Sequence, residues 1–219
     1  MSTSQIEVRI LGCLVEKERT TPEAYPLSTN ALLLACNQKS NRDPVVNYHL
    51  QEVEETLRLL GSKGMVSSVM APGERAVKHR HLLDGVLGIS QREMAVLAVL
   101  MLRGPQTPGE LRSRTERYVS FSSVGEVEAT LQRLAEHQPP LARNNGRSPG
   151  QSQDRWSDTF NPDPDRQRPR VRAVARESDG AALPAGAEAA LAGRIERLEA
   201  ELAWLYEHLG VTKPDDGLH

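Results

Sequence analysis

Basic side chains in predicted hairpins and loops are the residues of this chain that could do chemistry. Lysine and arginine in such positions can bind phosphate oxygens, which positions a protein on a nucleic acid without reading its sequence. The alternative is an ordinary solvated surface, because basic residues are common in loops. The candidates for nucleic-acid binding are Lys39, Arg42, Arg75, Lys78, Arg80, Arg112, Arg114, Arg117, Arg143, Arg147 and Arg155.

Other reactive residue types form no pattern typical of a catalytic or metal site. His79 and His81 alternate on a predicted strand and share a face, but a metal site needs three or four ligands and no third is near in sequence. Cys13 and Cys36 are far apart, and we expect both to be small core residues. The chain has neither a Gly-x-x-x-x-Gly-Lys loop nor a Gly-x-Gly-x-x-Gly motif. We expect no enzyme activity, no catalytic residues, no metal and no cofactor.

One dense polar stretch, residues 37–44, has two interpretations. Its amides and Asp43 can hold a loop between helices through bonds from side chain to backbone. Alternatively, the stretch is a surface for a ligand or a partner.

Two parts of the chain repeat one plan of elements. Each contains an apolar helix (residues 5–17 or 91–102), a short middle helix capped by Ser28 or Thr107, a third helix, and two strands joined by a turn. The third helices share apolar positions at i, i+4 and i+7, which are Val53, Leu57 and Leu60 in one copy and Val127, Leu131 and Leu134 in the other. This plan predicts a mainly α fold with small β-hairpins (α+β): winged-helix domains over 1–85 and 86–160. The alternative is two small α+β domains with no groove-binding role.

Glutamates open both predicted third helices, residues 50–63 and 124–136. A winged helix that reads DNA usually places this helix in the major groove, where carboxylates would face phosphates. The residues concerned are Glu52, Glu54, Glu55, Glu126 and Glu128. Acidic side chains also suit the positive end of a helix dipole. In either case, base reading by these helices is disfavoured.

The C-terminal part has a different composition. Four prolines mark residues 161–186 as an extended linker, and residues 187–211 form a predicted amphipathic helix before the tail, 212–219. Its apolar steps alternate between four and three, which is typical of a coiled coil, at Leu191, Ile195, Leu198, Leu202, Leu205 and Leu209. The helix is expected to form a homodimer; the alternative is docking on a core of its own chain.

Composition limits the remaining possibilities. The 219 residues carry a net charge of −2, which does not indicate nucleic-acid binding by bulk charge. No apolar run approaches the ~20 residues of a membrane span, and the first residues do not resemble a signal peptide. We therefore expect a cytoplasmic protein with no membrane partner.

Residues 16–44 resemble the signature block of the YceH-like family of uncharacterised bacterial proteins. Residues 102–112 resemble the second block of that family, and residues 78–81 match its basic strand. The likeness covers residues 5–160. It implies a pair of winged-helix domains in a bacterial cytoplasmic protein, and it supplies no catalytic residue.

Two hypotheses for the function follow. The first is a DNA-binding or transcription-associated protein that contacts the phosphates of duplex DNA as a homodimer. The alternative is a module that binds another protein through its acidic third helices.

Overall fold

The computed structural model describes residues 3–70, 76–147 and 150–160. All of them lie in one compact unit, Met1–Arg170. The predicted linker, the oligomerisation helix with its leucine seam, the tail and Arg75 lie outside the described residues, so these assignments stay predictions.

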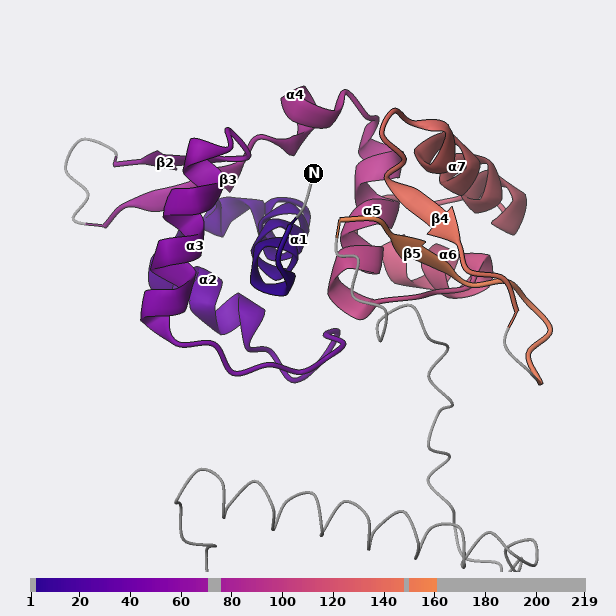
Figure 1. The fold of residues 1–219 in the computed structure, drawn as a ribbon, viewed down its shortest axis with the longest axis horizontal. Coiled ribbons are helices and arrows are strands. Elements are labelled where there is room, and N and C mark those ends of the chain that lie inside the picture. The colour runs from indigo at the N-terminus through magenta and orange to yellow at the C-terminus, as the bar shows by residue number, and fades with distance from the viewer. Residues whose placement is uncertain (1–2, 71–75, 148–149, 161–219) are drawn as a thin grey trace, which may run out of the picture. The chain divides into compact units, whose positions relative to one another are not determined.

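The first repeat (residues 5–81) runs helix, strand, helix, helix, hairpin (Figure 1). It consists of α1 (Gln5–Thr20), the 3₁₀ helix η1 (Pro22–Ala24), β1 (Leu27–Ser28), α2 (Thr29–Cys36), α3 (Leu50–Ser62), β2 (Val66–Val69) and β3 (Lys78–His81). Ser28 caps α2, as predicted, by accepting a bond from the Ala31 N–H. The strands form an antiparallel sheet in the order β1-β3-β2. The sequence did not predict β1, because a strand of two residues has no readable period.

The second repeat (residues 91–158) follows a short helix, α4 (Leu83–Leu87), that the sequence did not predict. It consists of α5 (Gln91–Arg103), α6 (Pro108–Thr115), α7 (Val124–Glu136), β4 (Ala142–Asn144) and β5 (Trp156–Asp158). Thr107 caps α6, as predicted, and forms a capping box with Glu110; Ser90 forms another with Glu93 at the start of α5. An isolated antiparallel bridge joins Gln106 to Trp156. It places β5 between Gln106 and β4, just as β3 lies between β1 and β2.

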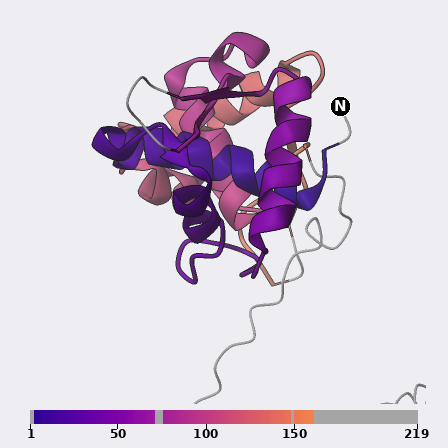
Figure 2. The ribbon, with the colours of Figure 1, turned by 90° about the vertical axis from the view of Figure 1, so that its left-hand side faces the viewer.

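The described part of the chain is therefore mainly helical with small antiparallel sheets, which confirms the α+β class. Figure 2 views the first repeat with the second behind it. The division into domains at residue 85 stays a prediction.

Helices α1 and α5 pack against each other where the two repeats meet. Both are buried on all sides over long runs, residues 7–16 of α1 and 94–102 of α5. The apolar sequence of α5 predicted this burial; in α1 it extends to Glu7, Arg9 and Glu16. At Gly12 the contact is closest, since a Cβ there would lie 3.0 Å from Leu102 Cδ2 and 3.3 Å from Met101 Cβ. The repeats thus share one core.

A valine at Gly12 should lower the free energy of unfolding by about 1–3 kcal/mol, because α1 and α5 would have to separate to admit its methyl groups. Urea unfolding measures this. Gly61→Val in α3 is the matched control, because the nearest contact of a Cβ there is the Val66 carbonyl oxygen at 3.9 Å. If Gly12→Val costs no more than Gly61→Val, the close approach is not important for stability.

Candidate functional site

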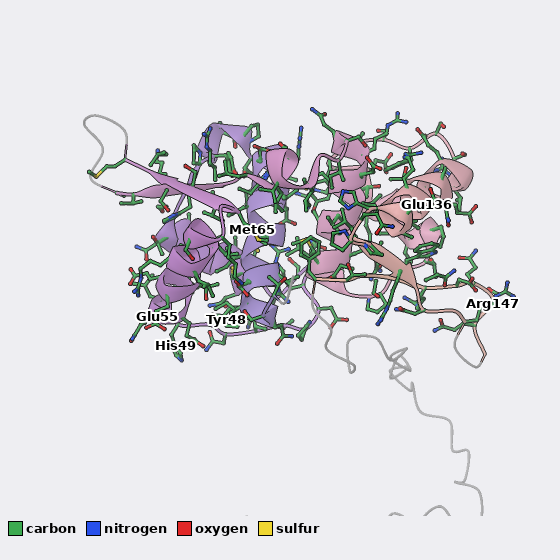
Figure 3. All side chains as sticks on the ribbon, turned by 45° about the horizontal axis from the view of Figure 1, so that its top comes forward. Tyr48, His49, Glu55, Met65, Glu136 and Arg147 are labelled. Atoms are coloured by element: carbon green, nitrogen blue, oxygen red, sulfur yellow. The ribbon has the colours of Figure 1, made fainter. Side chains whose placement is uncertain are left out.

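The outward face of α3 carries carboxylates and apolar groups. Its opposite face packs into the core through Val53, Thr56, Leu57 and Leu60. The exposed side chains away from the core include Gln51, Glu54, Glu55, Arg58 and Leu59. Figure 3 shows Glu55 and His49 at the surface of the first repeat.

The glutamates of α3 have two different roles. Glu52 accepts a 2.6 Å bond from the His49 N–H at the start of the helix. This capping explains its position without any partner. Glu55 accepts a bond only from Gln51 Nε2, at 2.9 Å, and within the described residues neither Glu54 nor Glu55 forms an ion pair. Glu54 and Glu55 therefore face outward without an ion pair to the described residues, on the helix that also exposes Arg58.

Helix α7 repeats this arrangement. Its first-turn Glu126 accepts bonds from the N–H and hydroxyl of Ser122 and also pairs with Arg92. Glu128 and Glu136 are exposed, and Glu136 accepts a bond from Gln132 Nε2 at 2.9 Å. Figure 3 shows Glu136 on the second repeat, on a different helix from Glu55.

Large apolar side chains are exposed on the first repeat. Leu59 of α3 is 47% exposed and Leu34 of α2 is 72% exposed, while Leu50 lies at the start of α3. Leu59 thus lies on the same exposed face of α3 as Glu54 and Glu55.

Most predicted arginines of the second repeat are engaged by their own repeat. Arg147 Nε donates to Asp154 Oδ1 at 2.9 Å; Arg155 and Arg114 donate to Glu110 at 3.0 and 3.4 Å. Hydrogen bonds from Asn144 and Arg147 lower the pKa of the Asp154 carboxyl, which keeps it charged. The pair of Arg147 with Asp154 is neutral, whereas Arg114 and Arg155 share the single carboxylate of Glu110. These contacts reduce the attraction of this region for phosphates.

The other predicted basic residues are dispersed. Arg112 donates to the carbonyls of Phe121 and Ser122, and Arg143 donates to Asn145 Oδ1. Lys78 is half-buried on β3. Three of the predicted basic residues are exposed and form no hydrogen bond or ion pair with the described residues, and they lie on separate segments: Lys39, Arg80 and Arg117.

Arg42 is buried, so its prediction as a phosphate-binding residue is wrong. Its Nη1 and Nη2 donate to the two carboxylate oxygens of buried Glu16 at 3.2 and 2.5 Å, and its Nε donates to the Ala35 carbonyl. The Tyr118 hydroxyl of the second repeat donates to the same carboxylate at 3.2 Å. Burial and the negative charge of Glu16 raise the pKa of the Tyr118 phenol, so it remains a donor.

Further polar bonds join the loop after α2 to α5. Arg103 Nη2 donates to Asn41 Oδ1 at 2.5 Å, and the Asp43 N–H donates to the Leu102 carbonyl at 2.8 Å. Asn37 exchanges two 2.9 Å bonds with the Tyr48 backbone, so the loop-holding interpretation of residues 37–44 is confirmed for this amide. The sequence did not reveal the link to the second repeat, because these partners are more than 50 positions apart.

The two strand histidines share a face, as predicted, and that face is buried. His79 lies between the hydroxyls of Thr29 and Ser68 at 3.0 and 2.9 Å, and burial lowers its pKa. His81 Nε2 lies 3.1 Å from Glu18 Oε2. Over residues 3–70, 76–147 and 150–160, no group of three or more His, Cys, Asp or Glu could hold a metal. Cys13 and Cys36 are buried free thiols, which agrees with their predicted place in the core.

A hollow of about 500 Å³ lies between α7 and the β4-β5 hairpin. Its polar lining includes Glu128, Gln132, Asn144, Arg147 and Asp154, with Trp156 as the large apolar side chain. Since Glu128 and Gln132 belong to the outward face of α7, this hollow continues that surface. Sequence patterns could not predict this hollow, because it depends on how the hairpin folds over the helix.

Removal of the Arg42 guanidinium should destabilise the whole unit. Arg42→Ala leaves Glu16 buried without its cation, so we expect a loss of about 3–5 kcal/mol in the free energy of unfolding. Arg143→Ala, at an exposed arginine, should change it by about 0.5 kcal/mol or less. Urea unfolding measures the free energy of unfolding of both variants. The same measurement is made on the double variant Arg42→Ala with Glu16→Gln. Equal effects of Arg42→Ala and Arg143→Ala would contradict the structural role.

No helix among the described residues is long and apolar enough to cross a membrane.

Residues 3–151 match the family model described as "Protein of unknown function, DUF480". A UPF0502 protein of Koribacter versatilis is 44% identical to this chain, and the match covers 89% of this chain and 86% of the relative. A UPF0502 protein of Citrifermentans bemidjiense is 41% identical, with 97% of this chain and 94% of the relative covered. A UPF0502 protein of Klebsiella pneumoniae is 42% identical, with 93% of this chain and 96% of the relative covered. The chain therefore belongs to the DUF480 (UPF0502) family, in agreement with the resemblance to YceH-like proteins.

Proposed function

We propose that this protein is a non-enzymatic pair of winged-helix repeats that binds another cytoplasmic protein through the outward faces of its third helices. The repeated order of elements supports the winged-helix interpretation. In both repeats the last strand is central, between a short first strand or bridge and the other hairpin strand.

The observation that carries the choice of partner is the pair of outward carboxylates on α3. Glu54 and Glu55 occupy the surface that would enter a major groove, and neither forms an ion pair with the described residues, although Arg58 is exposed on the same helix. Each close carboxylate–phosphate approach would cost on the order of 1 kcal/mol or more at intermediate dielectric. A protein surface with lysine or arginine around an apolar patch would instead complement Glu54, Glu55 and Leu59.

Binding of duplex DNA is the second candidate. Exposed Arg80 and Arg117 form no ion pair with the described residues and could contact phosphates. In this proposal a homodimer through the C-terminal helix would raise a weak affinity by bringing several sites together. The dispersion of these cations over separate elements makes it the weaker of the two.

A photo-activated cross-linking amino acid at Leu59 separates the two candidates in cells of the organism that produces the protein. We expect one discrete protein adduct from Leu59 and none from Val86, which is 41% exposed on α4. The charge reversal Glu54→Lys with Glu55→Lys should reduce this adduct about tenfold or more, because like charges would then meet across the interface. The matched reversal Glu23→Lys with Glu116→Lys should leave it unchanged.

Two results would contradict the protein-binding proposal. It fails if position 59 forms no protein adduct, or if the α3 reversal leaves the adduct intact. The DNA candidate predicts affinity for duplex DNA that falls steeply with salt and weakens in Arg80→Ala with Arg117→Ala. It fails if no affinity is measurable at low salt.

A further inference from the structure

The hollow between α7 and the β4-β5 hairpin offers a ligand one carboxylate that the fold does not use. Its charged lining residues are Glu128, Arg147 and Asp154, so the lining carries one net negative charge. Arg147 and Asp154 neutralise each other, since Arg147 Nε donates to Asp154 Oδ1 at 2.9 Å. Glu128 is exposed and forms neither a hydrogen bond nor an ion pair with the described residues. A ligand can therefore pair with Glu128 without breaking a contact of the fold.

The helix wall of the hollow places a second acceptor near this carboxylate. Gln132 follows Glu128 by four positions, so the two side chains are neighbours on one face of α7. The Nε2 of Gln132 donates to Glu136 Oε1 at 2.9 Å, which leaves the Oε1 of Gln132 as an acceptor. Both residues line the hollow. This wall thus suits a ligand that donates several hydrogen bonds.

The hairpin wall is held in place by its own hydrogen bonds. Asp154 Oδ2 accepts from Asn144 Nδ2 at 3.0 Å, and the Gly146 N–H donates to Asn144 Oδ1 at 2.8 Å. Figure 3 shows Arg147 on this hairpin, at the surface of the second repeat. Because both oxygens of Asp154 already accept bonds, this wall adds shape to the hollow but no free charge.

The remaining lining includes a fixed apolar surface. Trp156 and Pro108 both line the hollow, and the indole side is largely covered, with Trp156 only 9% exposed. The Trp156 N–H donates to the Gln106 carbonyl at 2.8 Å, and its own carbonyl accepts from the Gln106 N–H at 2.9 Å. These bonds hold the backbone of Trp156 and fix where its ring lies.

We infer that this hollow binds an arginine side chain of the partner protein. The guanidinium bonds to the oxygens of Glu128 and Gln132, and the alkyl chain lies against Trp156. A guanidinium carries its N–H donors in a planar fork that can bond to two acceptors at once, and its charge matches that of the lining. The volume of about 500 Å³ is in the range of ligand pockets. The inference rests on the proposed function, because it names the group that the partner presents to α7.

Other ligand classes fit this lining less well. A phosphate or a carboxylate would meet the negative charges of Glu128 and Asp154, while the cation of the lining, Arg147, is bonded to Asp154. Arg143 precedes Asn144 on β4, so the alternation of a strand turns its side chain to the opposite side. A lysine has the charge but lacks the planar fork, so it would bond to the two oxygens less well.

Titration of the full chain with a short peptide tests the inference. The chain has two tryptophans, so in Trp204→Phe the NMR signal of the remaining indole N–H reports Trp156 alone. N-acetyl-Gly-Arg-Gly-amide should shift this signal in a saturable manner. The citrulline counterpart keeps the shape of arginine and lacks its charge, so it should bind about fivefold or more weakly. The lysine counterpart should also bind more weakly than the arginine peptide.

Two variants show whether the signal reports the proposed contact. Glu128→Gln should weaken binding of the arginine peptide about fivefold or more, because it removes the charge that pairs with the guanidinium. Glu116→Gln, the same change at an exposed glutamate after α6, should leave binding unchanged. The inference is wrong if the indole signal does not move, if the citrulline peptide binds equally well, or if Glu128→Gln has no effect. A shift caused by inorganic phosphate in place of the arginine peptide would also overturn it.

This titration and the cross-linking at Leu59 fail separately. A discrete adduct at Leu59 with no arginine binding at Trp156 overturns the arginine assignment and leaves the proposed function intact. Arginine binding at Trp156 with no adduct at Leu59 overturns the proposed partner surface on α3 and retains the hollow as an arginine site.

Discussion

The close contact of α1 and α5 at Gly12 is the constraint on which the rest of the structure depends. A hydrogen atom in place of a side chain lets two fully buried helices approach until Leu102 lies against the α1 backbone. Each repeat contributes its first helix to this contact and packs its third helix on the other side, α3 on α1 and α7 on α5. The two third helices are therefore held on a common framework, which matters for any partner that engages both.

Polar bonds also hold the two repeats together. Their arrangement follows from the free-energy cost of burying a charged group. A buried carboxylate is tolerated only when it is fully hydrogen-bonded, and Glu16 meets this condition through Arg42 and Tyr118, from different parts of the chain. In the second repeat Arg147 and Arg155 also lie against carboxylates, at an exposed and a partly exposed pair. Cations that look available in a sequence are thus used inside the fold, while the carboxylates of α3 remain outward.

Local signals in the sequence predicted much of the fold, and contacts across the chain account for what it missed. Capping residues such as Ser28 and Thr107, and the apolar period of Val53, Leu57 and Leu60, depend only on neighbours three to seven positions apart. The burial of Arg42 depends on Glu16, 26 positions away, so an arginine in a polar loop was read as a surface group. Likewise, β1 and the bridge of Gln106 to Trp156 form only when distant strands meet.

If the two repeats share one core, they should unfold together, and hydrogen exchange tests this directly. Amides in the buried turns of α3, at Val53 and Leu57, and of α7, at Val127 and Leu131, should exchange only through global unfolding, with one common free energy. We expect the opening free energies of these four amides to be equal and to fall together as urea is added. If one helix exchanges through an opening of clearly lower free energy while the other stays protected, the repeats unfold separately and the account is contradicted.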